Sequence, residues 1–306
     1  MSKLKKFYIL GSVGVDVVVG PIDSCPNWGH EVVVPYSSVR LSGAAGNSAL
    51  ILAKLGADVK LLTVLGNDQL GRIYKEMYEN LGVDTDNVKI IVGRTSLSVG
   101  FKEEKGERFF LTNLGVTGAA DFSGLFDTKG IKDSVVLICG VNLIPSMWKD
   151  EFVNVVEELS KDNLVALDTG CPKPEDWEEF REVVKKLLKH VHIFLPNEEE
   201  FISFNDTSTL EKAIEKYRKN EYPTAIVKLG PKGAAIVSKD LFKTIPTIPI
   251  KGGLEDTVGA GDSFNAGFLF HFVKDNTLGL ESSVVFASKI AAEWIKGSYW
   301  KEITLL

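Results

Sequence analysis

Short apolar runs rich in β-branched residues alternate with longer segments of helical periodicity along most of the chain. The short runs predict strands, at Phe7–Leu10, Val59–Val64, Val135–Ile138, Leu164–Leu167, Val191–Leu195 and Ala225–Lys228. The longer segments predict helices, at Ala44–Leu55, Asp68–Leu81, and about 146–160, 176–190 and 209–220. Such alternation predicts an α/β fold, in which a largely parallel, Rossmann-like sheet lies between two helical layers in a three-layer α/β/α arrangement.

Two regions, at about 13–40 and 94–112, interrupt this alternation with strand-like runs and no helical segment. The runs are Val15–Val19, Glu31–Val39, Leu97–Glu103 and Arg108–Thr112, and Glu104-Lys105-Gly106 predicts a hairpin turn between the last two. We expect a small antiparallel sheet that projects from the main body, either as a simple extension or as a lid over a ligand site. The prediction is therefore one α/β domain over residues 1–306 with a lid built from these two insertions.

Composition and charge narrow the classes of function. The 306 residues are 44% hydrophobic and 25% charged, which is typical of a folded enzyme and outside the range of disordered chains. The formal net charge is -6, and no Lys/Arg-rich run supplies the basic face that nucleic-acid binding needs. No apolar stretch is long enough to predict a membrane span. The widely spaced cysteines predict neither a disulfide framework nor a zinc site, which indicates a cytoplasmic protein: Cys25, Cys139 and Cys171.

The segment with the strongest chemical signal is D-T-V-G-A-G-D-S-F-N-A-G-F, Asp256–Phe268. It places Gly259, Ala260 and Gly261 directly before a predicted helix, where backbone N–H groups and the helix N-terminus together favour an anion. Asp262 follows in the first turn, where its carboxylate can accept a proton from a hydroxyl group. The alternative is an acidic residue that only caps the helix.

Other phosphate-binding devices are absent from the sequence. It has no G-x-x-x-x-G-K-[ST] run, so a P-loop is excluded. Its only G-x-G triplet, Gly259–Gly261, is followed by Phe264 where a dinucleotide fingerprint requires glycine. A nicotinamide oxidoreductase is therefore disfavoured.

Two distant segments carry a resemblance to a known family. Asp256–Phe268 is similar to the C-terminal signature of the ribokinase/PfkB family of carbohydrate kinases. L-S-G-A-A-G-N-S-A-L-I-L-A-K-L-G (Leu41–Gly56), followed by L-G-N-D-Q-L-G (Leu65–Gly71), resembles its N-terminal signature. The resemblance covers essentially the whole chain and implies a ribokinase-like fold and transfer of the γ-phosphate of MgATP to a hydroxyl group of a small sugar.

The resemblance also implies roles for individual residues. Asp262 would be the base and Gly259-Ala260-Gly261 the anion hole, while the acceptor would be held by Asp16, Gly43 and Asn47. The nucleotide would be bound by Asn197, Lys228, Gly230, Gly233 and Ser288. Glu200 would act indirectly on Mg²⁺, and Asp256 could lie near a monovalent cation such as K⁺. Asn197 before three glutamates is also an ordinary helix N-cap, and Lys228 could be a solvated residue at the end of a strand.

Several departures from the family pattern leave the acceptor open. Ser42-Gly43 stands where the family usually has Gly-Gly, and Ala44 stands where ribokinases often have lysine, which makes the stretch closer to fructokinases. Ser288 stands where the adenine-side helix often has asparagine. The competing hypotheses are a nucleoside kinase, whose base could stack on lid aromatics (Phe101, Phe109 and Phe110), and a non-catalytic sugar- or nucleotide-binding regulator. Exposed edges of lid strands make a homodimer through the lid an expectation.

Overall fold

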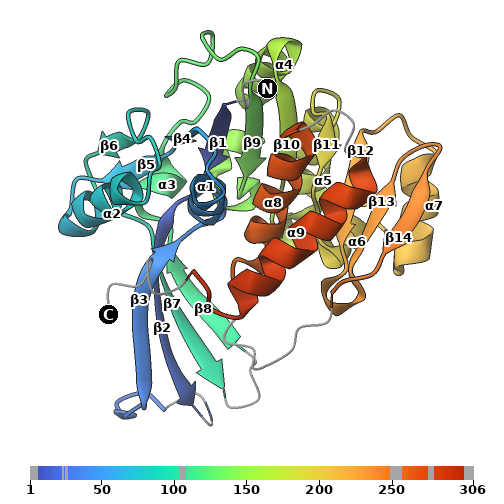
Figure 1. Ribbon diagram of the computed structural model, residues 1–306. Coiled ribbons are helices and arrows are strands. Elements are labelled where there is room, and N and C mark those ends of the chain that lie inside the picture. Colours follow the sequence, from blue (N-terminus) through green and yellow to red (C-terminus); the bar gives the residue numbers. More distant parts are fainter. Residues whose placement is uncertain are drawn as a thin grey trace.

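A mixed sheet forms the centre of the computed structural model, which describes residues 6–22, 24, 27–103, 108–248, 257–274 and 279–299 (Figure 1). Within these residues the strand order is β14-β13-β12-β11-β10-β9-β1-β4. The parallel strands are β4 (Val59–Leu62), β1 (Phe7–Gly11), β9 (Val135–Cys139), β10 (Leu164–Asp168), β11 (Ile193–Phe194) and β12 (Thr224–Lys228). An antiparallel hairpin that the sequence analysis did not predict completes one edge, formed by β13 (Ala234–Val237) and β14 (Phe242–Ile245).

Helices cover both faces of this sheet. Successive strand residues point to opposite sides, and in the central strands both sets are apolar, so both faces are buried. Val135 and Leu137 pack into the core beneath one group of helices, whereas Val136 and Ile138 pack beneath the other. The first group is α1 (Ala44–Lys54), α2 (Gln69–Asn80), α8 (Ala260–Lys274) and α9 (Leu280–Ile295). The second is α3 (Gly115–Ala119), α4 (Asp150–Asp162), α5 (Trp177–Leu187), α6 (Glu198–Phe204) and α7 (Leu210–Arg218). The predicted three-layer α/β/α fold is confirmed.

A four-stranded sheet projects from the main body (Figure 1). Its order is β3-β2-β7-β8, with bounds Tyr36–Ser42, Gly14–Ile22, Leu97–Glu103 and Arg108–Asn113. Each insertion forms an antiparallel pair as predicted, β2 with β3 and β7 with β8, and the two pairs are joined by parallel pairing of β2 with β7. The first insertion also forms its second strand later than expected, because the β2–β3 ladder ends at Gly20 opposite Tyr36 and leaves residues 31–35 without a paired strand. The expected turn at 104–106 lies outside the described residues.

The two faces of the projecting sheet differ in polarity. One row across all four strands consists of Arg40, Asp16, Ser98 and Thr112. The next row, on the opposite face, consists of Val39, Val17, Val99 and Leu111. The face that carries Asp16 is therefore polar along this row, although Val18 and Phe110 lie in its next row, and the opposite face is apolar.

A small third sheet pairs β5 (Val64–Gly66) with β6 (Lys89–Ile91). The single strand predicted at Val59–Val64 is therefore two strands, which separate at Thr63, whose hydroxyl donates to the Gly11 carbonyl (2.7 Å). Among the described residues, no helix is long and apolar enough to cross a membrane.

The direction of connection reverses at the centre of the main sheet. From β1 the chain crosses to β4 on one side, and from β9 it proceeds through β10, β11 and β12 on the other. Ligands of open α/β sheets bind beyond the carboxyl ends of the strands at such a reversal. This edge faces the projecting sheet, so the fold places a binding site between them (Figure 1).

Candidate active site

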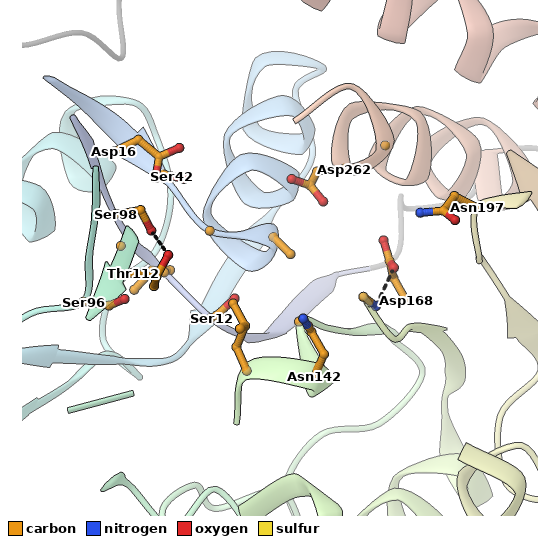
Figure 2. A pocket seen from close by; sticks show the side chains of 18 of the residues that line it. Ser12, Asp16, Ser42, Ser96, Ser98, Thr112, Asn142, Asp168, Asn197 and Asp262 are labelled. Atoms are coloured by element: carbon orange, nitrogen blue, oxygen red, sulfur yellow. Dashed lines mark hydrogen bonds between the residues drawn. The ribbon is translucent and has the colours of Figure 1, made fainter. Parts of the chain in front are cut away.

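A cavity of about 470 Å³ lies at this edge. Residues that end the parallel strands or follow them within three positions form one wall: Ser12, Gly140, Asp168, Asn197 and Lys228. The polar face of the projecting sheet forms another wall with Asp16, Ser96, Ser98 and Thr112. Figure 2 shows Asp262 between Asp16 and Ser98 on one side and Asp168 and Asn197 on the other. We call this space the polar cavity.

A second cavity of about 720 Å³ lies on the other side of Gly261. Its wall is mainly apolar, with Phe264, Ala291, Ala292 and Ile295 from α8 and α9. Ser288 also lines it, and its hydroxyl donates to the Val284 carbonyl of its own helix (3.0 Å). We call this space the apolar cavity. The two cavities share three lining residues, Lys228, Gly230 and Gly261, and therefore meet at the N-terminus of α8.

Close packing fixes the start of α8. Gly259 has φ 81°, and a Cβ atom there would lie 2.7 Å from the ring of Trp294, so a side chain is excluded on both counts. The Trp294 indole donates to the Val258 carbonyl (2.5 Å), which ties this turn to α9. The Ala260 N–H donates to the Thr257 carbonyl (3.2 Å). Gly261 and Asp262 lie in the first turn, where N–H groups have no acceptor within the helix.

Asp262 is held against α1. The Asn47 amide donates to Asp262 Oδ2 (2.8 Å), and the Ser48 hydroxyl donates to the Asp262 carbonyl (3.4 Å). Burial raises the pKa of Asp262 to about 7, the negative charge of Asp168 adds to this, and the Asn47 hydrogen bond opposes it. A carboxyl group with this pKa can exchange a proton with a ligand near neutral pH.

Lys228 is fixed at the junction of the cavities by three acceptors. Its ammonium donates to the Leu195 carbonyl (2.6 Å), Asp168 Oδ2 (3.2 Å) and Asn265 Oδ1 (3.1 Å). The Asn265 amide in turn donates to Asp168. Asp168 is 6% exposed, and a buried carboxylate needs such partners. The ammonium thereby lies close to Gly261, since a Cβ atom built there would be 3.7 Å from Lys228 Nζ.

Asn197 and Glu200 form a capping box at the start of α6. The Asn197 side chain accepts from the Glu200 N–H (2.8 Å), while Glu200 accepts from the Asn197 N–H (2.9 Å) and amide (2.8 Å). Burial, with Asp168 next in effect, raises the pKa of Glu200 to about 7. No cluster of three or more His, Cys, Asp or Glu side chains in the described part of the chain suits a metal. Asp168 and Glu200 still offer the hard oxygen atoms that Mg²⁺ uses together with phosphate oxygens.

Gly43 closes the opposite wall with φ 92°. A Cβ atom there would lie 2.5 Å from the Ser12 carbonyl, so only glycine lets α1 begin beside β1. Asp16 is buried, and the Ser98 and Thr112 hydroxyls beside it are hydrogen-bonded to each other (2.9 Å, Figure 2). Hydroxyl and carboxylate groups thus dominate this end of the polar cavity.

Comparison with known proteins agrees with this arrangement. The model of the family described as "pfkB family carbohydrate kinase" matches residues 29–299. This chain belongs to that family. An "uncharacterized sugar kinase" of Archaeoglobus fulgidus is similar to it, with 31% identity over 229 residues, 73% of this chain and 86% of the relative. A nucleoside kinase of Methanocaldococcus jannaschii is 25% identical over 277 residues, 89% of this chain and 85% of the relative.

Solved structures give the same fold for this pfkB-family chain. Ribokinase of Thermotoga maritima has a TM-score of 0.77 at 25% identity, and the match covers 95% of this chain and 93% of that one. Ribokinase of Arabidopsis thaliana, complexed with ribose and ATP, has a TM-score of 0.80 at 24% identity, covering 96% and 93%. The ribokinase-like fold is confirmed, and the chain is a phosphotransferase of the sugar or nucleoside kinase class.

Most residues singled out in the sequence lie together at the two cavities. The polar cavity contains Asp16, Gly43, Asn197, Glu200, Lys228, Gly230, Gly261 and Asp262. The apolar cavity contains Gly230, Gly233, Ala260, Gly261 and Ser288. Asn47 and Gly259 line neither cavity. Asn47 donates a hydrogen bond to Asp262, which lines the polar cavity, and Gly259 directly precedes Ala260, which lines the apolar cavity. Asp256 lies outside the described residues.

No sequence motif indicated that Lys228 is bonded to the side chains of Asp168 and Asn265. Asp168 carried a usable signal, because it is a charged residue that ends an otherwise apolar strand. Asn265 carried less, since only its position one helical turn after Asp262 marks it. The hydroxyl groups of Ser12, Ser96 and Ser98 had no local signal at all.

We predict that Asp262→Asn stabilises the protein above neutral pH. The folded protein raises the pKa of Asp262 from 3.8 to about 7, so the carboxylate costs stability progressively as the pH rises from about 4 through 7. Asparagine can still accept from Asn47 without that charge. Thermal unfolding at pH 8 should show a gain of about 1–3 kcal/mol, because one pKa unit corresponds to about 1.4 kcal/mol and the site is partly open to solvent.

The matched control is Asp240→Asn, which removes an exposed carboxylate. At pH 4 the gain for Asp262→Asn should largely disappear. A variant that is less stable than the wild type at pH 8, or equally shifted at both pH values, would contradict the assignment.

Proposed function

We propose that this pfkB-family chain transfers the γ-phosphate of ATP to a hydroxyl group of a small sugar. The observation that carries the proposal is the meeting of a polar and an apolar cavity at Gly261, with the Asp262 carboxyl group on the polar side. A nucleotide in the apolar cavity would place its terminal phosphate at this junction, next to the α8 N-terminus and the Lys228 ammonium. An acceptor in the polar cavity would then face it across Asp262.

The composition of the polar cavity favours a sugar over a nucleoside. Its described lining contains carboxylate, hydroxyl and amide side chains but no aromatic ring on which a base could stack. Phe101 and Phe109 stack on each other (4.9 Å between centroids) on the sheet's apolar face. Phe110 lies on the same face as Thr112, over Gly100, and does not line the polar cavity. A nucleoside acceptor stays the alternative, since the relatives include a nucleoside kinase and a cytidine kinase.

The proposed reaction is an in-line displacement. The acceptor oxygen forms a bond to the γ-phosphorus as the bond from that phosphorus to the β,γ-bridging oxygen breaks, and ADP leaves. The hydroxyl proton passes to the Asp262 carboxylate, which must be deprotonated at the start. N–H groups at Gly259–Asp262 and the Lys228 ammonium would stabilise the charge on the transferred group, with the Ala260 N–H first leaving Thr257 if it takes part.

Asn197 and Glu200 would bind the magnesium complex of the nucleotide indirectly. Both oxygen atoms of Glu200 already accept from Asn197, so contact through water suits this carboxylate better than direct ligation. Mg²⁺ would neutralise charge on the phosphates when bound. Asp16 would bind acceptor hydroxyls opposite the reacting group. A role for Asp256 with K⁺ stays a prediction from the resemblance.

The test is ADP release with MgATP across fructose, ribose, 2-keto-3-deoxygluconate, inositols and nucleosides. We expect turnover on a sugar or inositol, and a loss of roughly 10²–10⁴-fold in Asp262→Asn. ADP binding, measured by calorimetry, should persist in that variant and show that the site is intact. Preferential turnover of nucleosides would favour a nucleoside kinase. ATP binding without turnover, equal in both proteins, would favour a binding regulator.

We propose that the apolar face of the projecting sheet forms a homodimer. Leu111 is 62% exposed and Phe109 42% exposed on this face, beside Val17, Val39 and Val99. Packing two such faces across a two-fold axis would remove them from water. Light scattering should give twice the chain mass, and Leu111→Glu should give one chain mass, with Thr112→Glu on the other face as the control for added charge. A wild type of one chain mass would contradict the dimer.

A further inference from the structure

The segment Leu65–Gly71, singled out in the sequence, contributes no residue to either cavity. Its Asp68 is the N-cap of α2 and accepts from the Gly71 N–H through Oδ1 (2.8 Å). The same carboxylate reaches across to a distant part of the chain. Oδ2 accepts from the Thr95 N–H (2.9 Å), and Oδ1 accepts from the Thr95 hydroxyl (2.7 Å).

Asp68 therefore holds Thr95 by both its backbone N–H and its hydroxyl group. Its hydroxyl also accepts from the Gly66 N–H (3.0 Å), and the side chain is only 4% exposed. Burial alone would raise the pKa of Asp68, but the hydrogen bonds from Thr95 and Gly71 outweigh it and lower that pKa. The carboxylate is thus anionic at neutral pH, and its bonds to Thr95 are charge-assisted.

Three glycines pack closely around the backbone at residues 93–95. A Cβ atom on Gly66 would lie 2.5 Å from the Gly93 carbonyl, and one on Gly71 would lie 2.0 Å from the Gly66 carbonyl and 2.9 Å from Thr95 Oγ1. On the other side, a Cβ atom on Gly115 would lie 2.2 Å from the Arg94 carbonyl. The peptide at 94–95 therefore has little room to shift between the main body and the start of α3.

This peptide leads directly into the polar cavity. Ser96 and Ser98 follow Thr95 and line the cavity, and β7 begins between them. The Ser96 carbonyl accepts from the Val15 N–H (3.0 Å), which ties β2 to the same point next to Asp16. The positions of Ser96, Ser98 and Asp16 relative to Asp262 therefore depend on how Thr95 is held.

We propose that Asp68 is a positioning residue for the acceptor. Through Thr95 it fixes the base of the projecting sheet, so that Ser96, Ser98 and Asp16 present the acceptor hydroxyl to Asp262. This proposal rests on the proposed kinase function. It gives the Leu65–Gly71 segment a role without contact to either substrate.

The test is Asp68→Asn. Asparagine is a good N-cap, so it keeps the bond from Gly71, but its amide group cannot accept from the Thr95 N–H. We expect KM for the acceptor to rise about tenfold, since misplacing a positioning group by about 1 Å can cost roughly 100-fold. KM for MgATP should stay within about twofold. Thr95→Val should raise KM for the acceptor in the same way, whereas Thr95→Ser, which keeps the hydroxyl group, should have the KM values of the wild type. Asp127→Asn, which removes an exposed turn carboxylate that accepts from the Lys129 N–H, is the matched control.

Hydrogen–deuterium exchange separates this proposal from the kinase proposal. Amides of residues 95–102 should exchange at least tenfold faster in Asp68→Asn, while those of α1 stay unchanged. Unchanged exchange at 95–102, or a proportional rise of both KM values, would overturn the positioning role. Faster exchange in a protein whose wild type turns over no acceptor would support the structural clamp and overturn the kinase function on which its purpose depends.

Discussion

Like charges brought together in one cavity are the constraint on which the rest of the site depends. The carboxyl groups of Asp16, Asp168, Glu200 and Asp262 line the polar cavity, and within the described lining only Lys228 opposes them with a positive charge. Such an arrangement is costly in a partly buried site unless each group has fixed partners. Glu200 is bonded within its capping box, Asp262 accepts from Asn47, and Asp168 accepts from Lys228 and Asn265.

The fold supplies these partners because the carboxyl ends of its parallel strands share one edge. Asp168 ends β10, Asn197 follows β11 and Lys228 ends β12, so three neighbouring strands each deliver one polar side chain to the same place. The N-terminus of α8 approaches from the opposite side, held by α1 and by Trp294.

The sequence predicted the parts of this site that depend on local signals. The strand–helix alternation gave the three-layer fold, and two glycine-rich motifs indicated Asp262, Gly261 and Gly43 before any contact was known. Contacts that depend on strand order could not be predicted in the same way. Asp168 and Lys228 are 60 residues apart and meet only because β10 and β12 flank the short β11. The β13–β14 hairpin was missed because three of the four residues of its edge strand β14 are exposed, so no apolar or alternating run marks the pair.

The projecting sheet illustrates the same limit. Its alternating residues were recognisable, but the parallel pairing of β2 with β7 joins segments about 80 residues apart. The clamp at Thr95 depends equally on distance, since Asp68 lies on a different element. Local patterns thus indicate which residues are polar and strand-forming, whereas the pairing of elements decides which of them share a cavity.

Whether the two cavities bring a nucleotide and a sugar together at Asp262 is tested by a crystal structure with ADP, aluminium fluoride, Mg²⁺ and the sugar identified by the acceptor screen. We expect ADP in the apolar cavity, the fluoride complex at the Gly261 N–H beside Lys228, and one sugar hydroxyl within hydrogen-bonding distance of Asp262. Nucleotide bound away from α8, or a sugar whose hydroxyl groups all point away from Asp262, would contradict this expectation.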